Sequence, residues 1–164
     1  MQPSVKTKQA GFTLVELVIV ILILGILSAV ALPRFLNLGA EARQAKMEAI
    51  FGSMRAASQI TRAAALVQNG GAAASAASST VSLEGATVNT VFGYPAATAA
   101  GIVAAAGLDA TNDKVTIDTT TTAGTLYVVI NGAGTAANCR VLYTPPAAAG
   151  NAPTISLPAS PNCG

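Results

Sequence analysis

One carboxylate at the edge of a long apolar segment most constrains what this chain can fold into. Residues Leu17 to Leu32 carry no charge and only one polar side chain, Ser28, and Glu16 directly precedes them. A charged side chain inside a bilayer costs about 2.5–3.5 kcal/mol on insertion scales, so it usually has a partner and a function. The segment therefore predicts a helix apolar enough for a membrane, and Glu16 is the first candidate functional residue.

The composition excludes several classes of function. The chain has 164 residues and no histidine. Histidine is the usual general base and the commonest metal ligand, so neither an enzyme nor a bound cofactor is expected. Nine basic residues stand against seven acidic ones, and without Lys6 and Lys8 the two numbers are equal. Nucleic acid, which requires a basic surface, is not an expected partner.

The N-terminal segment has three interpretations on physical grounds alone. Residues 1–11 are polar and include two lysines, as in an ordinary secretory signal cleaved after Ala29-Val30-Ala31. The same pattern suits a plain membrane anchor with its positive side inside. The third interpretation is a leader cut on the cytoplasmic side, after Gly11, which leaves the apolar helix on the mature chain. Cleavage after Ala31 would discard Glu16 together with the apolar segment.

A long helix is predicted from about Phe12 to about Val67. Beyond Pro33 its apolar residues recur every three or four positions, which indicates an amphipathic half that a domain must cover: Met47, Ile50, Met54, Ala57, Ile60, Ala64 and Val67. Pro33 predicts either a kink or the end of the membrane helix with a fresh helix beyond it. Asn69-Gly70-Gly71 predicts the helix stop.

The C-terminal half is rich in short segments typical of strands. Residues 72–80 are Ala and Ser up to the terminal Thr80 and predict a loop or a frayed helix. Ala96–Ala106 is a candidate second helix with Pro95 at its start. The expected fold class is α+β, with an antiparallel sheet packed on the long helix. The predicted strands are Ala86–Phe92, Lys114–Asp118, Thr125–Asn131, Arg140–Thr144 and Thr154–Leu157; poor alternation within Thr125–Asn131 predicts a central strand buried on both sides.

The N-terminal motif resembles that of a known family. Gly11-Phe12-Thr13-Leu14-Val15-Glu16-Leu17, followed by an apolar segment with Gly25 and Pro33, resembles the signature of type IV pilins and pseudopilins. The resemblance implies cleavage between Gly11 and Phe12 by a prepilin peptidase and N-methylation of the new Phe12 amine. It also implies that Glu16 of one subunit meets the Phe12 amine of a neighbour, a buried pair that sets register more than stability.

The resemblance implies a division of the chain and a route for it. Residues 1–11 would be a removed leader, 12–33 a transmembrane and filament-core helix kinked near Pro33, 34–68 its amphipathic half, and 69–164 a globular head with an antiparallel sheet. The precursor would sit in the inner membrane, where pilus assembly machinery extracts it. The product would be a homo-oligomeric helical filament, an extracellular pilus on the cell surface.

Two cysteines lie near the C-terminus, at Cys139 and Cys163. In an exported chain they are expected to form a disulfide, and the alternative is two independent thiols. The bridge would hold the proline-rich tail, Pro145–Gly164, against the sheet. In type IV pilins the stretch bounded by this disulfide is exposed and takes part in subunit contacts and adhesion, and the resemblance implies the same here.

Two further segments resemble one pilin subfamily. Pro33-Arg34-Phe35-Leu36-Asn37-Leu38 and Phe92-Gly93-Tyr94-Pro95 are similar to the mannose-sensitive haemagglutinin (MSHA) type. That likeness implies a pilus subunit serving surface attachment. The alternative function is a pseudopilin of a type II secretion system, which acts as a periplasmic piston.

Weaker candidates lie in the predicted head. Asp109, Asn112 and Asp113 could supply oxygen ligands to calcium, but these residue types are also the default choice in turns. Tyr94, Tyr127 and Tyr143 could form a platform for sugars if they are exposed, although strand aromatics more often pack against neighbouring strands.

Overall fold

The computed structural model describes residues 11–164, apart from the side chains of five of them (Phe35, Leu36, Asn37, Asn69 and Ala73). The predicted leader lies outside the described residues except for Gly11. The chain divides into two compact units, Met1–Leu38 and Gly39–Gly164.

A single helix, α1, runs from Leu14 to Val67. The predicted long helix is confirmed, and it ends just before Gly70 and Gly71, which both have positive φ. Pro33 lies inside the helix, so the expectation that a fresh helix begins there is wrong. One lost hydrogen bond does not end a helix whose flanking turns are rich in the strong helix formers Leu and Ala. A kink at Pro33 stays a prediction.

In the first unit, α1 exposes its apolar side chains. Its most apolar 18-residue window has a mean hydropathy of 2.9, and no residue of that window is buried. By length and composition this part of the helix can cross a bilayer. An apolar surface of this extent requires lipid or another protein to cover it.

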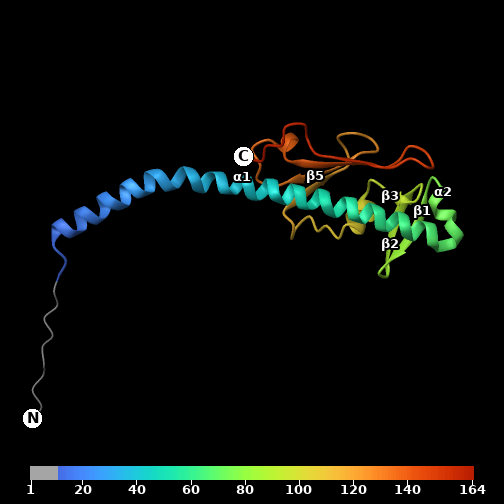
Figure 1. Ribbon diagram of the computed structural model, residues 1–164, viewed down its shortest axis with the longest axis horizontal. Helices are drawn as coiled ribbons and strands as arrows, with labels where there is room; N and C mark the ends of the chain where they lie inside the picture. Colours follow the sequence, from blue (N-terminus) through green and yellow to red (C-terminus); the bar gives the residue numbers. More distant parts are fainter. Residues whose placement is uncertain (1–10) are drawn as a thin grey trace, which may run out of the picture. The chain divides into compact units, whose positions relative to one another are not determined.

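The second unit holds two antiparallel sheets (Figure 1). The first has three strands in the order β1-β2-β3, and the second has four in the order β4-β5-β6-β7. Two-residue turns with positive φ, Glu84-Gly85 and Phe92-Gly93, join the strands of the first sheet, as hairpin geometry requires. The strands are β1 (Ser79–Leu83), β2 (Ala86–Val91), β3 (Tyr94–Pro95), β4 (Val115–Asp118), β5 (Leu126–Ile130), β6 (Arg140–Thr144) and β7 (Thr154–Ser156).

Five predicted strands are confirmed within about two residues, and two segments differ. The segment 72–80 was expected to be loop or frayed helix, and Ala72–Ser75 is indeed helical, but Ser79 and Thr80 begin β1. This strand was not predicted, because its Ser and Thr content obscures the inward-facing Val81. The expected helix over Ala96–Ala106 is confirmed only in part, because helical structure is confined to residues 99–105. Pro95 belongs to β3, and η2 (Ala99–Val103) is a short π-helical turn with non-helical φ/ψ at Gly101. The Ala96 carbonyl accepts from the amides of Thr98 and Ile102, and this loop packing overrides the propensity of the alanines.

Short helical turns complete the second unit. η1 (Gln68–Gly71) and α2 (Ala72–Ser75) follow α1, and η3 (Ala136–Asn138) precedes β6. Gly93 allows α2 and the β2–β3 turn to approach closely, because a Cβ there would lie 2.8 Å from Ala74 Cα. Arg62 of α1 donates to the carbonyl oxygens of Ala74 and Phe92, both at 2.9 Å, and so joins α2 to the β2–β3 turn.

The main core lies between α1 and the four-stranded sheet. Met47, Ile50, Met54 and Ala57 of α1 pack with inward side chains of β4, β5 and β6. In β5 four residues are buried, which confirms the prediction of a strand covered on both faces. The buried sheet residues are Val115, Leu126, Tyr127, Val128, Ile130, Val141 and Tyr143.

The predicted apolar stripe of α1 is wrong at Ile60 and Val67. Ile60 and Val67 are 59% and 81% exposed, whereas Thr61 and Ala65 are buried. The Thr61 hydroxyl donates to the Ala57 carbonyl oxygen at 2.8 Å, so its burial leaves no unpaired polar group. Ala65 is small enough to pack with Ala74 and Val81 of the three-stranded sheet region. In this part of α1, the close packing of small residues therefore decides which face is buried, and the hydrophobicity of the side chains does not.

Candidate processing and assembly site

The predicted cleavage site lies in an exposed segment that precedes the helix. Gly11, Phe12 and Thr13 precede the first residue of α1, and the Phe12 side chain is 90% exposed. A protease needs an extended, accessible backbone, and a helix would deny it that. The local conformation is therefore compatible with a cut between Gly11 and Phe12, and the small Gly11 leaves room for a peptidase.

Glu16 and Thr13 cap the first turn of α1 reciprocally. The Glu16 carboxylate accepts from the Thr13 amide at 2.9 Å and from the Thr13 hydroxyl at 2.8 Å. In return the Glu16 amide donates to Thr13 Oγ1 at 3.2 Å. The pair forms a capping box, which satisfies backbone donors that a helix start otherwise leaves unpaired.

The capping box supplies a partner that sequence reasoning missed. No basic side chain close in sequence suits Glu16, and the family resemblance implies a partner only in a second subunit. The signal was present as Thr13-Leu14-Val15-Glu16, since Ser or Thr followed three residues later by Glu is the capping-box pattern. Glu16 therefore orders the helix start of its own chain, and its negative charge still has no cationic partner among the described residues of that chain.

The two cysteines form the predicted disulfide. Cys139 and Cys163 are bonded, both are buried, and their Cα atoms lie 5.0 Å apart. The Asn162 amide donates to the Asn138 carbonyl oxygen at 3.0 Å beside the bridge. The tail from Pro145 onward is thus fixed at the bridge and at β7, which pairs with β6.

Two cations of α1 attach loops of the second unit to the helix. Arg43 Nε donates to the Cys163 carbonyl oxygen at 2.7 Å, and Lys46 Nζ donates to the Asp113 carbonyl oxygen. Hydrogen bonds from charged donors are stronger than neutral ones. The tail that carries the disulfide and the loop before β4 are therefore both held to the same stretch of helix.

The calcium candidates are engaged in a turn. Asp109 Oδ1 accepts from the amides of Thr111 and Asn112, and Asp109 Oδ2 accepts from the Asn112 side chain. Asp113 Oδ2 accepts from the Asp109 amide at 2.9 Å. The amides of Asn112 and Thr111 hold the pKa of the Asp109 carboxyl below its usual value. Within residues 11–164, no three Asp, Glu, Cys or His side chains come together in a way that could hold a metal ion.

The three tyrosines do not form one exposed platform. Tyr143 is fully buried and its hydroxyl donates to the Pro95 carbonyl oxygen at 2.6 Å. Burial raises the pKa of Tyr143 well above its usual range, and the nearby Ser58 hydroxyl offsets part of that rise. Tyr127 is also buried, beneath the Arg140 guanidinium, whose carbon lies 4.3 Å from the ring centroid. Tyr127 and Tyr143 therefore pack inside the second unit, as strand aromatics usually do.

Comparison with known proteins identifies the N-terminal segment. Residues 6–32 match the family model described as the prokaryotic N-terminal methylation motif. The chain is 53% identical over 47 residues to the type IV narrow pilus major component PilA5 of Thermus thermophilus, which covers 29% of this chain and 40% of that protein. It is 44% identical over 52 residues to the type IV major fimbrial protein FimA of Dichelobacter nodosus, which covers 32% of this chain and 33% of that protein.

These matches cover only part of each protein. The chain matches 33% to 40% of the length of these two curated relatives, and no solved structure matches it. Its N-terminal part is thus homologous to type IV pilins and carries their methylation motif. The long helix, the antiparallel sheets and the disulfide near the C-terminus fit the type IV pilin fold.

Proposed function

We propose that this chain is a structural subunit of a type IV pilus, assembled through its N-terminal helix. The observation that carries the proposal is one segment: an exposed Gly11–Phe12 bond, a capped helix start at Glu16, and an uncovered apolar helix, all within the methylation motif. The relatives that share this segment are named as a narrow pilus major component and a major fimbrial protein.

The proposed route begins in the inner membrane, where the apolar part of α1 anchors the precursor. A prepilin peptidase cuts between Gly11 and Phe12, and the new Phe12 amine is methylated. Assembly machinery then extracts the subunit, and the apolar helices bundle in a filament that extends outside the cell. Packing between helices offsets the lost lipid contacts, because the exposed side chains of α1 are buried again.

Glu16 sets the register of the proposed filament. Its charge meets the Phe12 amine of a neighbouring subunit, and the two charges neutralise each other only at the correct axial offset. Glu16→Ala is therefore expected to leave processing intact and to abolish filaments. Immunoblots of leader removal together with electron microscopy of sheared surface fractions test this, and normal pili from the variant would overturn the register role.

An MSHA-like role in surface attachment is the finer form of this proposal, and its support is the likeness at residues 33–38 and 92–95. The alternative is a pseudopilin of a type II secretion system. Long extracellular fibres that contain this chain support the pilus subunit. Confinement of the chain to short periplasmic assemblies, with loss of protein secretion when it is deleted, would support the pseudopilin.

A further inference from the structure

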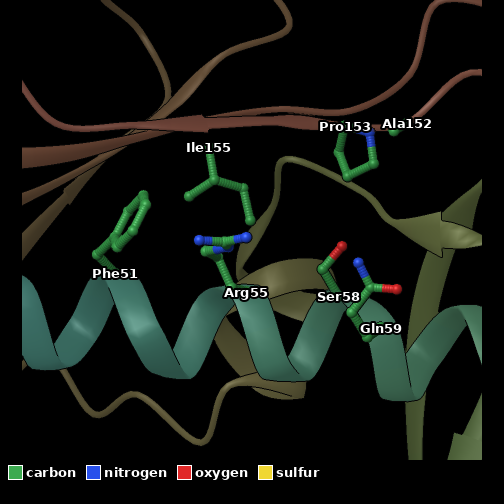
Figure 2. A pocket seen from close by; sticks show the side chains of 7 residues that line it. All are labelled: Phe51, Arg55, Ser58, Gln59, Ala152, Pro153 and Ile155. Atoms are coloured by element: carbon green, nitrogen blue, oxygen red, sulfur yellow. The ribbon is translucent and has the colours of Figure 1, made fainter.

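The surface of the second unit has a polar pocket and an apolar groove. The polar pocket, around Arg55, lies between α1 and the segment that leads into β7 (Figure 2). Figure 2 shows Arg55 and Gln59 projecting from α1 into it, and both side chains are exposed, so water can cover them. The apolar groove has a volume of about 370 Å³, and Glu84 is the one charged residue among those that line it. Water covers an apolar hollow poorly, so the groove is the surface that calls for a partner.

The apolar groove lies between α1, the β1–β2 hairpin and the segment that follows η2. Its apolar walls include Ile60, Leu83, Ala86, Val88 and Ala105. The hairpin is fixed to the end of the helix, because Gln68 Nε2 donates to the Ser82 carbonyl oxygen at 2.8 Å and the Ser82 amide donates to Gln68 Oε1 at 3.0 Å. Ile60 is nevertheless 59% exposed. The groove is therefore preformed, and its apolar lining is available to a second molecule.

Glu84 gives the groove a negative edge. It occupies the turn between β1 and β2 with a φ of 49°. Among the residues that the structure describes, its carboxylate has no hydrogen-bond donor and no cation beside it. Other carboxylates of the second unit accept hydrogen bonds from neighbouring residues, namely those of Glu48, Asp109, Asp113 and Asp118. A partner that fits this groove should therefore combine apolar side chains with one cation.

A second copy of this chain carries such a surface on its own α1. Arg34 is the one cation between residues 12 and 40. Val30, Arg34 and Leu38 follow one another at intervals of four residues, so they lie on one face of the helix. Val30 and Leu38 are 68% and 54% exposed, and Arg34 has no partner among the residues that the structure describes. When the apolar helices bundle, Arg34 is withdrawn from water and requires a carboxylate.

We propose that in the filament this groove receives the α1 face of a second copy that carries Val30, Arg34 and Leu38. Arg34 of that copy pairs with Glu84, and the two apolar side chains pack against the apolar walls of the groove. The inference rests on the proposed function, because it describes a second contact within the same filament. Unlike the contact of Glu16, it joins the apolar helix of one subunit to the sheet-bearing unit of another.

Charge variants test the pairing, with the yield of sheared surface filaments as the measurement. Glu84→Asn removes the charge, and Asn is favoured in a two-residue hairpin turn, so the second unit should stay folded. We expect this variant to lower the filament yield by about tenfold or more, because Arg34 is left without its partner. Glu84→Arg and Arg34→Glu should each abolish filaments, and a chain that carries both substitutions should form them again.

Two controls separate the pair from a general effect of charge. Glu41→Arg makes the same change of charge at an exposed position outside the groove, and it should leave the filament yield unchanged. Lys114→Glu combined with Glu84→Arg restores the net charge without restoring the pair, so it should form no filaments. A normal yield from Glu84→Asn, equal losses from Glu41→Arg and Glu84→Arg, or no recovery when Glu84→Arg and Arg34→Glu are combined would each overturn the inference.

Photo-crosslinking from Ala86, which lines the groove, identifies what covers it. A benzophenone side chain is placed at Ala86 of the full chain, and assembled filaments are irradiated, digested and analysed by mass spectrometry. The expected product is a covalent dimer of this chain in which the benzophenone is linked to the segment around Arg34. A crosslink to another protein, a crosslink to another surface of the second copy, or no crosslink would overturn the inference, while the filaments themselves would leave the proposed function intact. Absence of filaments from the unsubstituted chain would contradict the proposed function and this inference with it.

Discussion

The Thr13 hydroxyl and the Glu16 carboxylate lie 2.8 Å apart at the first turn of α1, within a reciprocal capping box. Glu16 therefore has two separable properties. Its oxygen atoms cap its own helix, and its charge is available to a second subunit. A residue that contacts its own helix start through one oxygen, Oε2, can keep the cap while its charge meets a neighbouring amine.

Two substitutions separate the cap from the charge. Glu16→Gln keeps a side chain that fits a capping box but removes the charge, and Thr13→Ala removes the cap at a cost of about 1 kcal/mol of local helix stability while the charge remains. We expect Glu16→Gln to be processed but to form no filaments, and Thr13→Ala to form filaments in lower yield. Quantitative immunoblots of sheared fractions compare them, and full filament yield from Glu16→Gln would mean that the charge is not used.

The disulfide is expected to stabilise the second unit. Cys139 and Cys163 close a loop with a sequence separation of 24. In the chain-entropy model such a loop is worth about 3–4 kcal/mol of unfolding free energy. The double substitution of both cysteines by alanine should therefore move the urea midpoint of the detergent-solubilised chain to lower concentration, and reduction of the unsubstituted chain should reproduce the shift. An unchanged midpoint in both experiments would contradict the role given to the bridge.

Tyr143 joins the two sheets through one buried hydrogen bond. Its hydroxyl, on β6, donates to the carbonyl oxygen of Pro95, on β3. Tyr143→Phe leaves that buried oxygen unpaired, so we expect a loss of about 1–2 kcal/mol in unfolding free energy. Tyr127→Phe is the matched control, because its hydroxyl pairs with Thr122 at a partly buried site, and its loss should be smaller. Equal losses of unfolding free energy in the two variants would show that the hydrogen bond to Pro95 stabilises the fold no more than the one to Thr122.

Asp118 should titrate far below an ordinary aspartate. Hydrogen bonds from the Thr121 hydroxyl, then from the Thr120 amide and hydroxyl, lower the pKa of the Asp118 carboxyl from 3.8 to about 2. Because the folded pKa is depressed, the contribution to stability is present above pH 3.8 and is lost as the pH falls toward 2. NMR titration of the carboxyl carbon measures this directly. Thr121→Val should raise the pKa, and an unshifted value in that variant would refute the assigned cause.

The sequence alone predicted the parts of the fold that local rules decide. The long helix, five of the seven strands and the disulfide follow from periodicity, β-branched content and cysteine placement. The errors occur where packing overrides local preference. Ile60 is more apolar than Thr61, yet Thr61 is buried, because its hydroxyl is satisfied within the helix. The helix expected around Gly101 gave way to a π-helical turn for a similar reason, since carbonyl contacts of Ala96 fix the loop.

The sequence predicted only those parts of the candidate site that lie within one contiguous motif. Gly11, Phe12 and Glu16 were identified from the motif, and the apolar helix from its composition. The capping role of Glu16 depends on the rotamer of one side chain and was overlooked, although its pattern was visible. The pocket around Arg55 could not be predicted, because Pro153 and Ile155 are far from α1 in sequence and only the fold brings them to it.

The mass of the mature N-terminus tests the central claim most directly. Intact-mass and tandem mass spectrometry of the chain, purified from cells that express a prepilin peptidase, determine both the first residue and its modification. A chain that begins at N-methylated Phe12 is the predicted result, and in a strain without the peptidase residues 1–11 should remain attached. A mature chain that begins at Leu32 would contradict the account, because cleavage there removes Glu16 and the apolar helix on which assembly depends.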